Sequence, residues 1–253
     1  MAASRGKRQI SRMRSSALSS VNGERAERHR RHLFGRRKGP KLSAHQLSLR
    51  ETLLPRLVLH IEKGRDPRGY FDKPVDDVWL EVGYGGGEHL LWQANAHPEV
   101  GLIGAEPYIS GTAKLLSRLD VQHVPNIRLH EDDARDIIEA LPGASIGRFF
   151  ILFPDPWHKT RHHKRRFIQT EMLDSIARIL KPGAEFRFAS DDAGYLAYAL
   201  ERLMAHPAFA WTASGPSDWK TRPADWPPTR YETKELHGPP AFLRFVRTGK
   251  VVP

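Results

Sequence analysis

Short apolar runs alternate with stretches of helical periodicity along residues 75–253. An apolar run bounded by turn residues is typical of a buried strand, and apolar residues recurring every three or four positions are typical of an amphipathic helix. Strands are predicted at 78–82, 101–105, 127–130, 149–153 and 184–189, and two last strands at 209–213 and 242–246. Helices are predicted over 88–95, 109–119, 167–180 and 195–205, with a short helix after residue 134. This alternation predicts an α/β fold with a doubly wound, mostly parallel sheet and helices on both faces.

Another helical pattern precedes the first strand. Helical spacing separates the apolar residues Leu49, Leu53, Leu54, Leu57, Val58 and Ile61. Ser48 and Glu51 have the spacing of a capping box at the start of a helix. We expect an amphipathic helix over 42–61, packed on the body, with a boundary or kink at Pro55. Two turn-rich segments remain. Residues 64–74 are expected to form a linker, and residues 214–240 a long loop.

Residues 1–41 differ in composition from the rest of the chain. They contain 13 Lys and Arg and two Asp and Glu, so their net charge of +11 equals the formal charge of the whole chain. Large apolar residues are few there, and such a segment cannot bury enough surface to fold alone. We expect a basic, mobile arm that attracts polyanions, followed by one folded domain over 42–253. An Arg- and Ser-rich, acid-poor start is also typical of a transit peptide, and that interpretation stays open.

The remaining composition limits the class of protein. A length of 253 residues suits one α/β domain with an extension. No apolar run is long enough to cross a membrane, and the N-terminus lacks the apolar region of a secretory signal. Cysteine is absent, which excludes disulfides and thiolate chemistry and favours a reducing cytoplasm. We therefore expect a cytoplasmic protein without a membrane partner, and a monomer is favoured.

The most informative stretch follows the predicted strand at 149–153. Asp155 lies there between two prolines, Trp157 comes next, and a basic run occupies 159–166. Proline restricts its own backbone and that of the residue before it, so Asp155 is expected in a rigid turn at a strand end, where ligands bind in open α/β sheets. A rigid acid, a flat ring and a cationic run suit a planar base attached to phosphates. The alternatives are an ordinary Asp-Pro turn and a solvated basic face.

A glycine-rich turn follows the first predicted strand. Gly83, Gly85 and Gly87 would allow a ligand to approach the backbone closely. The dinucleotide fingerprint needs glycine or alanine at the next position, where this chain has Glu88. Glu88 together with Glu81 would repel a pyrophosphate at this helix start. The turn therefore favours a cofactor without phosphates.

Carboxylates end the next two predicted strands as well. Glu106 ends the second strand, where an acid can accept hydrogen bonds from a ribose diol, and Asp133 follows the third, where it can accept one from an adenine amino group. A ribose, an adenine and a cationic sulfonium without phosphate are the parts of S-adenosylmethionine. The sequence thus predicts that cofactor.

These features occur in the order of a known enzyme family. They are Glu81-Val82-Gly83-Tyr84-Gly85, Glu106, Asp133-Ala134, Pro154-Asp155-Pro156-Trp157-His158-Lys159, Lys164-Arg165-Arg166, Asp191 and Thr229-Arg230-Tyr231-Glu232. Over about residues 45–247 the chain resembles a bacterial tRNA (guanine-N7-)-methyltransferase. The resemblance implies a Rossmann-like class I methyltransferase fold and transfer of a methyl group from S-adenosylmethionine to guanine N7 in the variable loop of tRNA. The chain departs from the family pattern at Gly86-Gly87, where a larger residue is often found, and at Arg230, where lysine is usual.

The resemblance also implies roles for single residues. It places Asp155 at the active site and at the cofactor, together with Glu81, Gly83, Gly85, Glu106 and Asp133. It assigns substrate contacts to Lys159, Asp191, Thr229, Arg230, Tyr231 and Glu232. By their charge, the phosphate-contacting residues of the basic run are expected to be Arg161, Lys164, Arg165 and Arg166.

Several readings remain open at this point. Trp157 either stacks on a base or packs the turn, and Asp191 either contacts substrate or caps a helix. No metal site is expected, because lysines and arginines flank the three histidines at 158–163 and repel a cation. The alternative functions are a class I methyltransferase acting on another nucleic acid or on protein, a nicotinamide dehydrogenase, and a non-catalytic RNA-binding module. Glu88 argues against the dehydrogenase, and the intact acids argue against the binding module.

Overall fold

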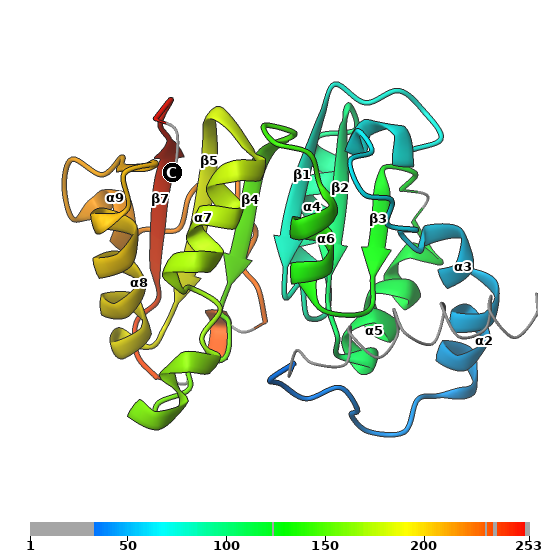
Figure 1. The fold of residues 1–253 in the computed structure, drawn as a ribbon. Helices are drawn as coiled ribbons and strands as arrows, with labels where there is room; N and C mark the ends of the chain where they lie inside the picture. The colour runs from blue at the N-terminus through cyan, green and yellow to red at the C-terminus, as the bar shows by residue number, and fades with distance from the viewer. Residues whose placement is uncertain (1–32, 123, 231, 235–236, 251–253) are drawn as a thin grey trace, which may run out of the picture. The chain divides into compact units, whose positions relative to one another are not determined.

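The computed structural model describes residues 33–122, 124–230, 232–234 and 237–250 (Figure 1). Within these residues one sheet has the strand order β3-β2-β1-β4-β5-β7-β6. Its strands are β1 Asp77–Val82, β2 Val100–Ala105, β3 Ile127–His130, β4 Ile146–Leu152, β5 Leu180–Ser190, β6 Phe209–Trp211 and β7 Ala241–Arg247. Strands β1 to β5 are parallel, and β7 is antiparallel to β5 and β6. The predicted doubly wound, mostly parallel sheet is confirmed.

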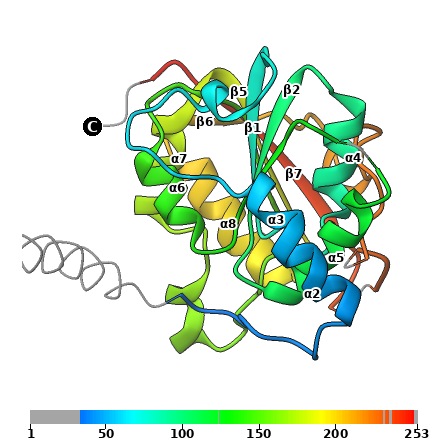
Figure 2. The same ribbon diagram turned by 90° about the vertical axis from the view of Figure 1, so that its right-hand side faces the viewer.

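Helices connect these strands and cover both faces of the sheet (Figure 2). The α-helices are α2 Ala44–Thr52, α3 Leu54–Leu57, α4 Glu88–Ala96, α5 Ile109–Leu119, α6 Ala134–Ala140, α7 Thr170–Ile179, α8 Ala193–Ala205 and α9 Ser217–Lys220. The 3-10 helices are η1 Pro67–Tyr70, η2 Thr160–Arg165 and η3 Glu232–Lys234. Among the described helices, none is both long and apolar enough to cross a membrane.

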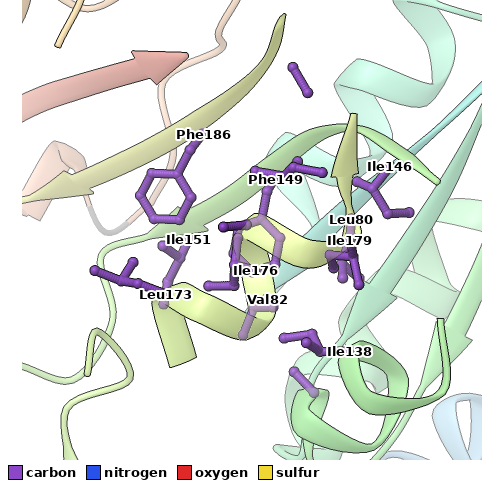
Figure 3. Packing of buried hydrophobic residues seen from close by; sticks show 14 of the residues in the cluster. Leu80, Val82, Ile138, Ile146, Phe149, Ile151, Leu173, Ile176, Ile179 and Phe186 are labelled. Atoms are coloured by element: carbon purple, nitrogen blue, oxygen red, sulfur yellow. The ribbon is translucent and has the colours of Figure 1, made fainter. Parts of the chain in front are cut away.

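Each face of the sheet has its own apolar core. On one face, Phe149 and Ile151 of β4 pack against residues of α7 such as Leu173 and Ile176, together with α6 and α8 (Figure 3). On the other face, α2, α3, α4 and α5 pack against the sheet, and Trp226 of the long loop is buried there as well. Because β4 alternates its side chains between two cores, it is a central strand, and its carboxyl end is held rigidly.

The N-terminal helical segment differs from the prediction. The capping box is formed by Ser43 and Gln46, so the N-cap of α2 lies five residues before the predicted cap at Ser48. Pro55 has no backbone N–H to continue the hydrogen bonds of α2, and a second short helix, α3, follows. After α3 the chain extends, and Leu59 donates its N–H to the carbonyl of Leu129. The expected single helix over 42–61 is therefore wrong in its start and in its end.

The helix predicted over 167–180 also begins later than expected. The backbone N–H groups of Phe167 and Ile168 donate to the hydroxyl oxygen of Tyr195, over 3.0 and 3.3 Å. A partner from α8 thus takes up donors that a sequence pattern assigns to the helix, and α7 starts at Thr170. At its other end α7 stops at Ile179, and β5 already begins at Leu180.

Most of the predicted basic arm, residues 1–32, lies outside the described residues. From Arg37 onward the chain contacts the body. The carbonyl of Arg37 accepts the N–H of Ile109, and its guanidinium pairs with Asp132 at 3.1 Å. Residues 37–41 therefore belong to the body, and the end of the arm at residue 41 is corrected to a point before Arg37.

Candidate active site

The candidate site lies at the carboxyl ends of the parallel strands. These ends are aligned, because the register pairs Val82 with Ala105 and with Ile151, and Ala105 with His130. The arrowheads of β1, β3 and β4 therefore all point downward in Figure 1, towards the lower end of the sheet. This alignment brings together the segments that follow β1, β2, β3 and β4, which carry the predicted acids.

The turn after β1 depends on glycine. Gly83, Gly85 and Gly87 have φ angles of 75°, 54° and 75°, which side chains with a Cβ rarely adopt. A Cβ at Gly111, in α5, would lie 2.4 Å from the carbonyl oxygen of Gly85. A Cβ at Gly83, by contrast, would meet no atom within 4 Å. The turn is thus tightly packed on its α5 side and leaves open space beside Gly83.

Glu106 is held against this turn. Its Oε2 accepts the N–H of Gly85 over 2.7 Å, and its Oε1 accepts the N–H of Tyr108 over 2.9 Å. Burial raises the pKa of Glu106, the two backbone N–H groups lower it, and the charges of Asp155 and Glu81 raise it further. Each carboxylate oxygen has a second lone pair for a ligand hydroxyl. The geometry thus suits the ribose role predicted for Glu106.

Glu81 is buried inside the sheet. Its side chain lies on the α4 face, and its Oε2 is 2.8 Å from Nδ1 of His89. The electrostatic effect of Glu81 and Asp155 on Glu106 places three negative groups in one region of the strand-end site. From the sequence we did not predict a role for His89. Its position, a polar residue on the apolar face of a helix that follows a glycine turn, could have indicated one.

Asp133 caps α6. Its Oδ1 accepts the N–H of Arg135 over 3.0 Å, and the carboxylate also pairs with the Arg135 guanidinium. It lies three residues past the end of β3, beside β2 in the sheet. Its place agrees with the predicted position, and its side chain also has a local structural role.

The turn that carries Asp155 is strained on both sides. Phe153 and Trp157 have φ angles of 50° and 47°, in the left-handed region that residues with a Cβ seldom adopt. Such angles persist where surrounding contacts impose them, and they concentrate at functional sites. The N–H of Phe153 donates to the carbonyl of Ala189 in β5. Between these two residues the side chain of Asp155 is exposed.

Arg166 requires a correction. We expected it to contact phosphate, but it is 3% exposed, and its guanidinium donates to the carbonyls of Pro156 and Gly194. The same group lies over the rings of Tyr195 and Tyr198, at 4.8 and 4.7 Å from their centroids. Because its guanidinium joins these two carbonyls to the rings of α8, Arg166 braces the turn.

The other members of the basic run lie on or beside η2. Lys159, Arg161 and Lys164 are exposed, whereas the guanidinium of Arg165 lies 5.0 Å from the ring centroid of Trp157. Trp157 is half-buried, so the structure gives its ring a packing partner. The exposed cations remain placed for the phosphate contacts that we predicted.

The histidines of this run lie in positive surroundings. Desolvation and the nearby charges of Arg165, Arg161 and Lys159 lower the pKa of His162. Across the part of the chain that the structure describes, no group of three or more metal-binding side chains is found. The chemistry that the run offers is therefore binding of anions.

The segment predicted to contact substrate is organised by its own side chains. Thr229 and Glu232 are buried, and each accepts a hydrogen bond from the backbone N–H of the other. Glu232 also pairs with Arg222 at 2.8 Å. Arg230 is exposed between them, and Tyr231 lies outside the described residues. Thr229 and Glu232 thus shape the loop that presents Arg230.

Asp191 and Asp192 divide two roles at the end of β5. Asp192, which the sequence reasoning left unassigned, caps α8 through the N–H of Tyr195 and contacts Nδ1 of His158 at 3.0 Å. Asp191 does not cap the helix; its Oδ2 accepts the N–H of His237 over 3.2 Å. Capping of α8 was one of the two roles considered for Asp191, and the structure gives that role to Asp192. The end of the long loop is therefore tied to the strand-end site through Asp191.

A cavity of about 400 Å³ lies elsewhere on the body, between the 217–226 segment and strands β5 and β7. Its arginines already face carboxylates: Arg187 pairs with Glu185 and Asp225, Arg222 with Glu232, and Arg244 with Glu185. These pairs leave no excess charge to attract an anion, so the strand-end acids remain the candidate site.

Comparison with known proteins identifies relatives of this chain. A family model described as "Putative methyltransferase" matches residues 76–239. A tRNA (guanine-N(7)-)-methyltransferase of Rhodospirillum rubrum is 52% identical over 221 residues, which cover 85% of this chain and 87% of the relative. A relative of the same name from Brucella anthropi is 48% identical, over 85% of this chain and 94% of its own. One from Ruegeria sp. is 43% identical, over 92% of this chain and 96% of its own.

The chain belongs to the tRNA (guanine-N(7)-)-methyltransferase family. The resemblance seen in the Pro-Asp-Pro-Trp turn is confirmed, and so is the class I methyltransferase fold. Family membership decides against the dehydrogenase and the non-catalytic binding module. Methyltransferases of this class use S-adenosylmethionine.

The donor set of this methyltransferase fits that cofactor. Glu81 and Asp155 both lie within electrostatic reach of Glu106, and this group of carboxylates disfavours a pyrophosphate and favours a cationic sulfonium. Glu106 keeps lone pairs for ribose hydroxyls, and open space lies beside Gly83. A phosphate-bearing dinucleotide would meet the same negative groups.

Proposed function

We propose that this methyltransferase transfers the methyl group of S-adenosylmethionine to N7 of a guanine in the variable loop of tRNA. The observation that carries the proposal is the exposed carboxylate of Asp155 in a strained turn, beside the buried acids Glu81 and Glu106 and ahead of the cations of η2. A negative centre and a cationic surface within one segment suit a purine of an RNA chain.

The cofactor site is assigned to the strand-end residues. Glu106 binds the ribose hydroxyls, Asp133 accepts a hydrogen bond from the adenine amino group, and Gly83 and Gly85 allow close approach to the backbone. Glu81 supplies negative charge for the cationic end. When bound, S-adenosylmethionine supplies an activated methyl group.

The reaction needs little acid–base chemistry from the protein. Guanine N7 carries a lone pair in the plane of the ring, so no proton has to be removed before it attacks a methyl carbon. Catalysis then consists mainly of positioning and of a favourable electric field. The Asp155 carboxylate accepts hydrogen bonds from guanine N–H groups and stabilises the positive charge that develops on the purine.

The cations of η2 act on binding. Lys159, Arg161, Lys164 and Arg165 contact phosphates and fix the register of the RNA, while Arg230 and Asp191 contact the nucleotide. The reaction is assigned to the cytoplasm, which agrees with a chain that lacks cysteine.

Mapping of methylated nucleosides tests the proposal. Unmodified bulk tRNA, rRNA, DNA and protein are incubated with the enzyme and methyl-labelled S-adenosylmethionine, and the labelled product is digested and identified. N7-methylguanosine from the tRNA variable loop is expected. Asp155→Asn, which keeps the size of the side chain but removes its charge, is the matched control. Label in another nucleic acid, at another guanine atom or in protein would overturn the proposed substrate.

A further inference from the structure

A chain of buried polar groups runs from β1 to the long loop. Oε2 of Glu81 is 2.8 Å from Nδ1 of His89, and Nε2 of His89 is 3.1 Å from Nε2 of Gln93. The same nitrogen of Gln93 donates to the carbonyl oxygen of Asp225 over 2.8 Å. Glu81, His89 and Gln93 are 2% exposed or less. The contacts thus connect a cofactor acid with the loop without passing through solvent.

The hydrogen-bond directions along this chain follow from its last member. The carbonyl of Asp225 can only accept, so the Gln93 amide must present its NH2 group to it. That NH2 group is also the neighbour of the His89 Nε2, which therefore accepts. The proton of a neutral His89 then lies on Nδ1 and is donated to the Glu81 carboxylate. Each link assigns the next one, and the tautomer of His89 is fixed at both ends.

Aromatic rings enclose His89. The centroid of the His89 ring lies 4.7 Å from that of Phe150 and 5.3 Å from that of Trp226, and both contacts are edge-on. Trp226 is the residue after Asp225, whose carboxylate pairs with Arg187 at 2.7 Å and with Arg148 at 3.5 Å. The beginning of the 225–232 segment is therefore anchored on the histidine and on the two arginines of β5 and β4.

We propose that His89 is a positioning residue, which holds Glu81 oriented in the cofactor site and ties it to the long loop that contains Thr229 and Glu232. A buried carboxylate is costly without a hydrogen-bond donor, and the Nδ1–H of His89 supplies one to Glu81. Gln93 transmits the position of the loop to the ring of His89. The inference rests on the proposed function only in so far as the loop contacts tRNA.

Two substitutions separate the two bonds of the imidazole. In His89→Asn the amide nitrogen stands near the place of Nδ1, so the donor to Glu81 is kept and the contact with Gln93 is lost. In His89→Gln the amide stands near the place of Nε2, so the contact with Gln93 is kept and the donor is lost. We expect cofactor affinity near that of the wild type in the first variant and about ten-fold weaker in the second.

Calorimetric titration with S-adenosylmethionine over a series of pH values is the decisive measurement, since it needs no RNA and remains valid if the proposed substrate is wrong. In His89→Gln, affinity should fall more steeply as pH decreases than in wild type or His89→Asn, because the unpaired Glu81 becomes protonated. The charged groups that face this pair in all variants are Glu106, Asp155, Asp225, Arg148 and Arg187.

The link to the loop has its own test. Gln93→Leu removes the bonds to the Asp225 carbonyl and to Nε2 of His89, and leaves the His89–Glu81 bond in place. We expect a several-fold higher KM for tRNA with cofactor affinity unchanged. Folding of each variant is checked by melting temperature. Equal losses of cofactor affinity in His89→Asn and His89→Gln, or a wild-type pH profile in folded His89→Gln, would overturn the inference.

Discussion

Nε of Arg166 donates a hydrogen bond to the carbonyl oxygen of Pro156 over 2.8 Å. One member of the basic run therefore holds the backbone of the turn in which Asp155 is exposed. Its guanidinium also lies beside the rings of Tyr195 and Tyr198 of α8, so the brace reaches from the turn into the core. Asp155 is exposed in a strained turn because Arg166, from the same segment, is buried and holds the backbone of that turn.

Replacing Arg166 should affect folding and catalysis before it affects RNA binding. Arg166→Lys keeps the charge but loses the planar fork, and we expect a loss of about 2–3 kcal/mol in the free energy of unfolding. The kcat should fall with it, because the turn is no longer held. Arg161→Ala, at an exposed position of the same run, is the control and should weaken tRNA binding at unchanged stability. Denaturant unfolding and filter binding measure both quantities. A folded Arg166→Lys protein of normal stability that only binds tRNA more weakly would restore the phosphate role.

Glu106→Ala should weaken S-adenosylmethionine binding by about 1–3 kcal/mol, the size of a lost charge-assisted hydrogen bond. Glu106 accepts two backbone N–H groups and keeps a lone pair on each oxygen for the ribose. Calorimetry on the folded variant measures the change, and unchanged affinity would remove Glu106 from the cofactor site.

The raised pKa of Glu106 gives this group a pH dependence of known sign. The native protein binds a proton there at higher pH than the unfolded chain does, so the stability that depends on Glu106 increases as pH falls from neutral towards the ordinary pKa of a carboxyl group. Cofactor affinity should fall over the same range, because the protonated group loses its charge and acceptor strength. In the wild type, the melting temperature should rise and the cofactor affinity should fall as pH decreases over this range. Glu106→Gln, which has no titrating group at this position, is the control. A melting temperature and an affinity that change in the same direction in the wild type would contradict the assignment.

Removing residues 1–32 should lower tRNA affinity and leave the fold intact. This segment holds most of the basic excess of the sequence, and the cut stops before Arg37, which contacts Ile109 and Asp132. Because fewer counterions are released on binding, the dependence of affinity on salt concentration should become less steep. Binding isotherms at several salt concentrations measure the salt dependence of tRNA affinity, and a melting curve shows whether the fold is intact. An unchanged salt slope would contradict the polyanion-binding role.

Asp155 and Lys159 should separate rate from affinity. Asp155→Asn should lower kcat by about 100-fold or more with little change in tRNA binding, since the carboxylate acts on charge that develops in the transition state. Lys159→Ala should weaken tRNA binding, and the difference from wild type should shrink at high salt. Single-turnover kinetics and filter binding on both variants are the measurements. A near-normal single-turnover rate in Asp155→Asn would show that the turn is structural.

Much of the fold could be predicted from local patterns alone. The helix over Ile109–Leu119 and the strand over Ile127–His130 have the predicted bounds, because periodicity of apolar residues reflects the geometry of a single element. The positions of Glu106, Asp133 and Asp155 after strands followed from the same reasoning, since parallel strands end at one edge of a sheet.

Tertiary structure decided which of those residues face a partner within the chain. Arg166 and its exposed neighbour Arg161 are alike in sequence, and only the rings of α8 make one of them a brace. The pairing of Glu81 with His89 and the late start of α7 under Tyr195 likewise depend on groups brought together by folding. Periodicity indicates which side of an element is apolar, whereas the partner of a buried polar group is set by packing between elements distant along the chain.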